Sequence, residues 1–128
     1  MRVLVCGSRH LKDYKVLKET LDELMPLPGF LDYFIISGGA RGADSMAEDY
    51  AIEEDIPYQI FRANWEKHGK AAGPIRNKQM LDEGKPDLVV AFMAPDSRGT
   101  KNMVEQATKA GIEIKIVHIG SEKPVDAF

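Results

Sequence analysis

The fold is decided by one stretch, Ser37-Gly38-Gly39-Ala40-Arg41-Gly42-Ala43-Asp44. It follows a short apolar run, Tyr33 to Ile36, which predicts a buried strand, and it precedes a helical pattern of small and apolar residues. Three glycines between a strand and a helix leave backbone without side-chain bulk at the carboxyl end of the strand. Amide N–H groups in such a turn, together with the positive end of the helix dipole, favour the binding of anions such as phosphate.

The alternation of strand and helix continues along the chain. Apolar runs predict strands at residues 2–6, 33–36, 58–61, 87–92 and 113–119. Helical patterns lie between them at residues 11–24, 42–54, 74–84 and 99–111, whereas residues 63–73 are interpreted as an irregular polar stretch. Near-continuous apolar strands separated by helices are typical of a parallel sheet covered on both faces. We therefore predict an α/β fold, a three-layer sandwich around a five-stranded parallel sheet in the order 3-2-1-4-5, as one domain over residues 1–128.

The bulk composition restricts the function classes. At 128 residues the chain suits one domain with a hydrophobic core. The net charge of −3 provides no global basic field, which argues against a nucleic-acid partner, and a local basic patch stays open as an alternative. Cys6 is the only cysteine and ends an apolar run, so we expect a buried core residue in a reducing, cytoplasmic setting. No apolar run approaches the roughly 20 residues that span a bilayer, so no membrane partner is expected.

Three loops are predicted to meet where ligands bind in such sheets, at the carboxyl ends of the strands. They are residues 7–10, 37–44 and 94–100. In the first loop, Gly7 permits a tight turn, Ser8 offers a hydroxyl, and Arg9 offers a forked cation that suits phosphate or carboxylate. A helix-capping turn with a solvated arginine explains the same residues equally well.

The second loop has a functional and a structural interpretation as well. Its candidate ligand-binding residues are Ser37, Gly38, Gly39, Arg41 and Gly42. The loop matches neither a Walker motif nor a strict Gly-x-Gly-x-x-Gly fingerprint, and a tight turn packed on the sheet is the alternative. Asp44 falls in the first helical turn, where it either compensates the helix dipole or holds a ribose hydroxyl.

The remaining candidates lie in the second half of the chain. Gly99 and Thr100 open a helix and could form a second anion cradle, although helix capping there is also common. Arg76 could pair with a phosphate, and Trp65 could either stack on a base or fold under the loop as a plug. His68 has no second histidine or cysteine at metal-ligand spacing, so we assign no metal.

Together these segments resemble the SLOG superfamily, which groups Rossmann-like nucleotide-binding domains related to the DNA-processing protein DprA/Smf and to the cytokinin-activating LOG phosphoribohydrolases. The closest resemblance is to its branch of small stand-alone YspA/YpsA-related proteins. The stretches that carry it are Cys6-Gly7-Ser8-Arg9, the octapeptide at Ser37, Ala72-Gly73-Pro74 with Arg76-Asn77 and Met80, and Gly99-Thr100-Lys101-Asn102-Met103. The resemblance implies a Rossmann-like sheet, a nucleotide-derived ligand at the glycine loops, and a homo-oligomer such as a dimer. In the binding hypothesis that follows, Trp65 binds the base, Arg76 and Asn77 bind phosphate or ribose, and Asn102 orients a ribose hydroxyl.

The resemblance is weaker for catalysis. LOG enzymes carry Gly-Gly-x-Gly-Thr-x-x-Glu at the start of a helix, and the glutamate falls on Met103 here. Cleavage of an N-glycosidic bond needs a carboxylate near its oxocarbenium-like transition state. We therefore expect a binder of a nucleotide or an ADP-ribose-like ligand, acting in sensing, signalling or sequestration, with no assigned catalytic residue or cofactor. Two alternatives stay open, a nucleotide N-glycosidic hydrolase and, more weakly, a single-stranded nucleic-acid binder.

Overall fold

The computed structural model describes residues 1–26 and 33–120, and its centre is a parallel sheet in the order β3-β2-β1-β4-β5. The strands are β1 (Arg2–Gly7), β2 (Phe34–Ser37), β3 (Tyr58–Ile60), β4 (Leu88–Met93) and β5 (Glu113–His118). β4 is buried along its whole length because it lies between β1 and β5 and is covered on both faces. The predicted fold class and strand order are confirmed.

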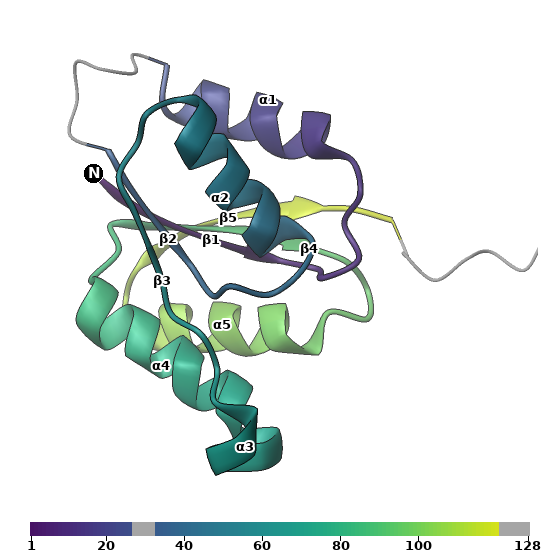
Figure 1. Cartoon of the computed structure of the whole chain (residues 1–128), viewed down its shortest axis with the longest axis vertical. Helices are drawn as coiled ribbons and strands as arrows, with labels where there is room; N and C mark the ends of the chain where they lie inside the picture. The colour runs from purple at the N-terminus through teal and green to yellow at the C-terminus, as the bar shows by residue number, and fades with distance from the viewer. Residues whose placement is uncertain (27–32, 121–128) are drawn as a thin grey trace, which may run out of the picture.

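Two helical layers cover the sheet. Helices α1 (Tyr14–Leu24) and α2 (Ala43–Glu53) lie on one face, and α4 (Ala72–Gly84) and α5 (Arg98–Lys109) lie on the other (Figure 1). The side chains of β4 alternate between the two cores, since successive residues of a strand point to opposite faces. Val90 and Phe92 pack in the core under α1 and α2, while Val89 and Ala91 pack in the core under α4 and α5.

The parallel register brings the predicted loops to one side of the molecule, which we call the carboxyl edge. Gly7 at the end of β1 pairs with Phe92 of β4, and Val5 pairs with Ser37 of β2. The loop after β1 touches both neighbours, because the Ser8 N–H donates to the Phe92 carbonyl at 3.0 Å and the Ser8 carbonyl accepts from the Ala43 N–H at 3.1 Å. The loops that follow β1, β2 and β4 therefore lie side by side.

Residues 63–73 are more ordered than the sequence predicts, so the expectation of an irregular stretch was wrong. They form a short helix α3 (Trp65–His68), a 3-10 turn η1 (Gly69–Ala71) and the start of α4 at Ala72. The Asn64 side chain accepts a hydrogen bond from the Lys67 N–H at 3.1 Å and caps α3, and Gly69, with φ +55°, ends it. Within the described ranges no helix is long and apolar enough to cross a membrane.

Candidate functional site

Two glycines allow the loops at the carboxyl edge to approach one another. Gly42 has φ +76°, and a Cβ atom there would lie 2.4 Å from the Ser8 carbonyl oxygen. A Cβ atom on Gly7 would lie 2.7 Å from Phe92 and 2.8 Å from the Ala43 side chain. Both positions therefore need glycine for the packing of the strand ends, whatever the loops bind.

The amide groups of the second loop are largely satisfied inside the protein. The Asp44 carboxylate accepts hydrogen bonds from the Ala40 N–H, at 3.2 Å, and from the Gly38 N–H. The Gly39 N–H donates to the Ser37 hydroxyl at 3.3 Å. This differs from the expectation that the glycine-loop amides face a ligand, because the loop folds back on its own acidic residue.

Asp44 is the main electrostatic feature of this loop. Its side chain is only 5% exposed, and burial raises the pKa of the carboxyl to about 7, against the lowering effect of the amide bonds and of Arg76. The half-buried Glu48 lies nearby, and its carboxylate accepts a hydrogen bond from the Ser37 hydroxyl at 3.4 Å. The loop therefore holds a buried acid whose charge changes near neutral pH.

Arg76 of α4 reaches the same loop from the other helical layer. Its Nη1 donates to the Gly38 carbonyl at 2.6 Å, and its Nε donates to Asn77 Oδ1 at 3.1 Å. A Cβ atom on Gly38 would lie 2.7 Å from Arg76 Nη1 and 2.8 Å from Asp44 Oδ2. Because Gly38 has no side chain, the Arg76 guanidinium and the Asp44 carboxyl group can both approach its backbone. The guanidinium has further N–H groups that can donate to a ligand.

Asn77 ties α4 to the start of α5. Its buried amide donates to the Gly99 carbonyl at 3.2 Å and to Asn102 Oδ1 at 3.1 Å. Gln106 also donates to Asn102 Oδ1, at 2.7 Å, so Asn102 accepts from both sides. These bonds hold the first turn of α5 next to Arg76.

The first turn of α5 is open to a ligand. The N-cap residue Ser97 makes no side-chain cap bond, because its hydroxyl accepts from the Ala94 N–H at 3.1 Å. A Cβ atom on Gly99 would meet nothing within 4 Å, so the space beside Gly99 in the first turn is free. Thr100 in the same turn is buried. The first amide groups of a helix have no partner inside the helix, and they attract anions.

The structure brings together most of the predicted site residues and leaves a few apart. Those joined by contacts at the carboxyl edge are Gly7, Ser8, Ser37, Gly38, Gly39, Gly42, Asp44, Arg76, Asn77, Gly99 and Asn102. Arg9 and Arg41 extend from the same loops with exposed side chains. Trp65 is 58% exposed and lies over Gly73, one helical turn before Arg76, so it does not act as a plug.

Sequence reasoning missed Arg62. Its Nη1 donates to the Gly39 carbonyl at 3.3 Å, so a second guanidinium holds the glycine loop from the β3 side. The sequence contained a signal for this role, because Arg62 directly follows the third predicted strand and therefore lies at the carboxyl edge. Cys6 lies in the core as predicted, and burial raises the pKa of its thiol far above its usual range.

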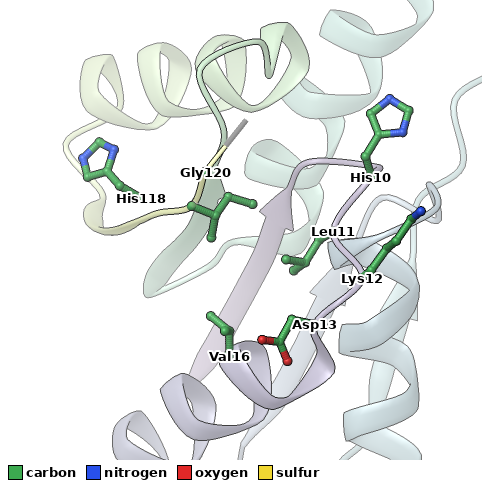
Figure 2. Close-up of a pocket in the computed structure, with 8 residues that line it drawn as sticks. His10, Leu11, Lys12, Asp13, Val16, His118 and Gly120 are labelled. Carbon is green, nitrogen blue, oxygen red and sulfur yellow. The ribbon is translucent and has the colours of Figure 1, made fainter. Parts of the chain in front are cut away.

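Neither of two hollows at the surface is lined by the Arg76 cluster. One, of about 520 Å³, lies between the loop after β1 and the end of β5, where Leu11 and Val16 contribute apolar surface and His10 and His118 stand on opposite sides (Figure 2). The other, of about 260 Å³, is lined by residues of α1 and α2. Across the described residues, no three His, Cys, Asp or Glu side chains gather closely enough to hold a metal ion.

Comparisons with known proteins show the family of this chain. The model of the YspA, cpYpsA-related SLOG family matches residues 1–68, which include the loops after β1 and β2. The chain belongs to this family. This SLOG protein is also 40% identical over 119 residues to the Gene 61 protein of Mycobacterium phage D29, across 88% of this chain and 93% of the phage protein. The resemblance noted from the motifs is therefore confirmed.

A solved structure supports the fold of this SLOG protein. The X-ray structure of TM1055, a structural-genomics target, superposes with a TM-score of 0.63 over 88% of this chain and 71% of that chain. The two sequences are 16% identical, so the similarity concerns the fold alone.

Proposed function

We propose that this SLOG protein binds a nucleotide or an ADP-ribose-like ligand at the carboxyl edge of the sheet, for sensing, signalling or sequestration. The phosphate lies at the first turn of α5 and is held by Arg76, and the base lies against Trp65. Asn102 orients a ribose hydroxyl, and the buried Asn77 holds Arg76 and the start of α5 in place. Family membership and the strand-order switch between β1 and β4 support this location, since ligands of open α/β sheets bind there.

One observation carries the proposal, namely the position of the Arg76 guanidinium. It is half-buried, fixed by Gly38 and Asn77, and held next to the helix start by the bond between Asn77 and the Gly99 carbonyl. The Arg98 N–H at the helix start donates to the Asp96 carbonyl at 3.1 Å, so the guanidinium and the next two N–H groups, of Gly99 and Thr100, form the donor pattern proposed for phosphate. The N–H groups of Gly38 and Ala40 in the second loop are bonded to Asp44, so this loop positions Arg76 through the Gly38 carbonyl and does not donate those N–H groups to the phosphate.

Calorimetry tests the proposal. AMP, ADP and ADP-ribose are titrated into the wild type and into Gly99→Val, which places a branched side chain in the open space of the first turn. We expect at least one ligand to bind more tightly than about millimolar, roughly 4 kcal/mol, and to lose that affinity in the variant. Lys109→Val, which places the same branched side chain at the far end of α5, is the control and should leave ligand affinity unchanged. Binding to none of the ligands would contradict the proposal.

The alternative of an N-glycosidic hydrolase has less support. Met103, at the position of the LOG glutamate, is 0% exposed and packs in the core with Met80 and Leu81. Asp44 is engaged by the loop amides, and Glu66 lies on the exposed surface of α3. Neither of these two carboxylates is presented at the first turn of α5.

A further inference from the structure

Charge is distributed unevenly between the two edges of the sheet, although the whole chain carries a formal charge of −3. Exposed cations follow the ends of four strands at the carboxyl edge: Arg9, Arg41, Arg62, Lys67, Lys70 and Arg98. The exposed acids of these same loops are fewer: Asp13, Glu66 and Asp96. The carboxyl edge is therefore basic.

The opposite edge carries much of the negative charge. The helices α1, α2 and α4 end there, and their last turns carry exposed acids: Asp22, Glu23, Glu53, Asp82 and Glu83. The net charge of the chain does not reveal this separation, because the positive charges of one edge and the negative charges of the other largely cancel in the sum. A polyanion approaching the molecule meets an attractive field at the carboxyl edge and a repulsive field at the other.

An aromatic side chain stands within the basic surface. Trp65 is the only tryptophan of the chain and is 58% exposed. It belongs to helix α3, which lies below α4 at the bottom of Figure 1. Lys67 and Lys70 follow it directly in α3 and η1, and Arg62 connects the segment to the glycine loop through Gly39. The exposed ring and the cations are thus continuous with the proposed nucleotide site.

The cations are spread more widely than one nucleotide can use. The ends of the four strands cover three strand spacings, about 14 Å at ~4.8 Å each. Charges farther apart than the Debye length, about 8 Å at physiological ionic strength, are largely screened from one another. A single phosphate at the start of α5 therefore gains little from the distant cations, whereas a longer polyanion can contact several of them.

We propose that the carboxyl edge binds single-stranded nucleic acid, with its phosphates along these cations and one base stacked on Trp65. Exposed aromatic rings with cations along a surface are the usual means of binding single strands without sequence preference. The inference rests on the proposed function, because one nucleotide of the strand occupies the Arg76 site. The acidic net charge, which argued against nucleic acid, does not describe this surface.

The test measures binding of short oligothymidylate, short oligouridylate and AMP at several salt concentrations, using the fluorescence of Trp65. We expect both oligonucleotides to quench the fluorescence and to bind more tightly than AMP. The logarithm of their affinity should fall with the logarithm of salt concentration by about 0.7 for each phosphate neutralised. Unequal affinity for the two oligonucleotides would tell whether DNA or RNA is preferred.

Variants locate the surface. Lys67→Ala and Lys70→Ala should each reduce the salt slope by about 0.7, and Trp65→Ala, measured with a dye-labelled strand, should weaken binding roughly 5- to 150-fold. Lys109→Ala, at the end of α5 on the opposite edge, is the matched control and should change nothing. An equal effect of Lys109→Ala would overturn the proposal.

The outcomes separate the two proposals. Oligonucleotides that bind no more tightly than AMP would refute the strand proposal and leave the nucleotide site standing. Oligonucleotide binding with the expected slope, but without AMP binding, would support the strand proposal and refute an independent nucleotide site. Absence of binding by all three ligands would refute both.

Discussion

Arg76 Nη1 donates a 2.6 Å hydrogen bond to the carbonyl oxygen of Gly38, a residue 38 positions earlier in the chain. The bond joins α4 to the loop after β2 and places the guanidinium beside the Asp44 carboxyl group. It therefore fixes one cation at the point where two glycine loops and a helix start meet. The first prediction follows from this contact.

Arg76→Ala should weaken nucleotide binding by roughly 10- to 150-fold, because a charge-assisted hydrogen bond contributes about 1.5–3 kcal/mol. Calorimetry with the tightest-binding nucleotide measures the change, and a thermal melt checks that the variant is folded. Lys78→Ala on the same helix is the control, since Lys78 is exposed and pairs with Asp82. Equal losses in the two variants would show that Arg76 acts only through the net charge.

Gly42→Ala should destabilise the protein by about 2 kcal/mol or more. The positive φ of Gly42 strains any L side chain, and the new methyl group would overlap the Ser8 carbonyl and Arg9. Gly99→Ala should stay within about 1 kcal/mol of the wild type, because its Cβ atom enters open space at the start of a helix. Urea denaturation of both variants measures the contrast, and a folded, fully stable Gly42→Ala protein would contradict the close approach of the two loops.

Stability should depend on pH through Asp44. Burial raises the pKa of its carboxyl from 3.8 to about 7, so the folded protein binds a proton that the unfolded chain has released. The contribution of the neutral carboxyl is complete below about pH 4 and is lost as pH rises through 7. About three pKa units correspond to a loss on the order of 4 kcal/mol.

Urea denaturation of the wild type and of Asp44→Asn from pH 5 to pH 8 tests whether the free energy of unfolding falls with rising pH because of Asp44. The variant cannot ionise at this position, so its free energy of unfolding should fall less over this range than that of the wild type. Asp49→Asn, an exposed carboxylate on the same helix, should retain the wild-type pH dependence. A wild-type protein that becomes more stable between pH 5 and pH 8 while Asp44→Asn does not would show that Asp44 is ionised and favourable in the folded state.

The protein should release little or no free base from AMP. The helix α5 offers Asn102 to the site and buries Met103 in the core, so the position of the LOG glutamate carries no carboxylate for the transition state of N-glycosidic cleavage. Loss of such a preorganised group commonly costs about a hundred- to a thousand-fold in rate. Chromatography of AMP incubated with the protein measures base release. Robust release by the wild type that disappears in Arg76→Ala would make the hydrolase the primary function.

Met103→Glu is not a simple way to restore that carboxylate. The Met103 side chain is fully buried against Met80 and Leu81, so a glutamate would have to ionise in an apolar core or displace the helix. We expect this variant to be destabilised by several kcal/mol and to gain no activity, which a thermal melt would reveal before any assay.

Local patterns were enough to predict the sheet and the loops that leave it. Apolar runs such as Leu88 to Met93 are buried on both faces, and only a central parallel strand satisfies that requirement. Glycines that follow such strands mark the turns, so the place of Gly7, Gly38 and Gly42 at one edge could be predicted as well. The helical structure around Trp65 was missed, because a four-residue helix with its cap at Asn64 has too few residues to show a period.

The order of the strands and the edge at which a ligand would bind follow from local periodicity and from the handedness of parallel crossovers, both of which are present in the sequence. How the side chains at that edge are used depends on tertiary contacts. Asp44 turns its carboxylate onto the amides of its own loop, Met103 faces the core, and Arg76 approaches Gly38. The tertiary structure also separated the charges that cancel in the composition. These outcomes depend on contacts between residues far apart in the chain, and no local pattern specifies the distance or the direction of such a contact.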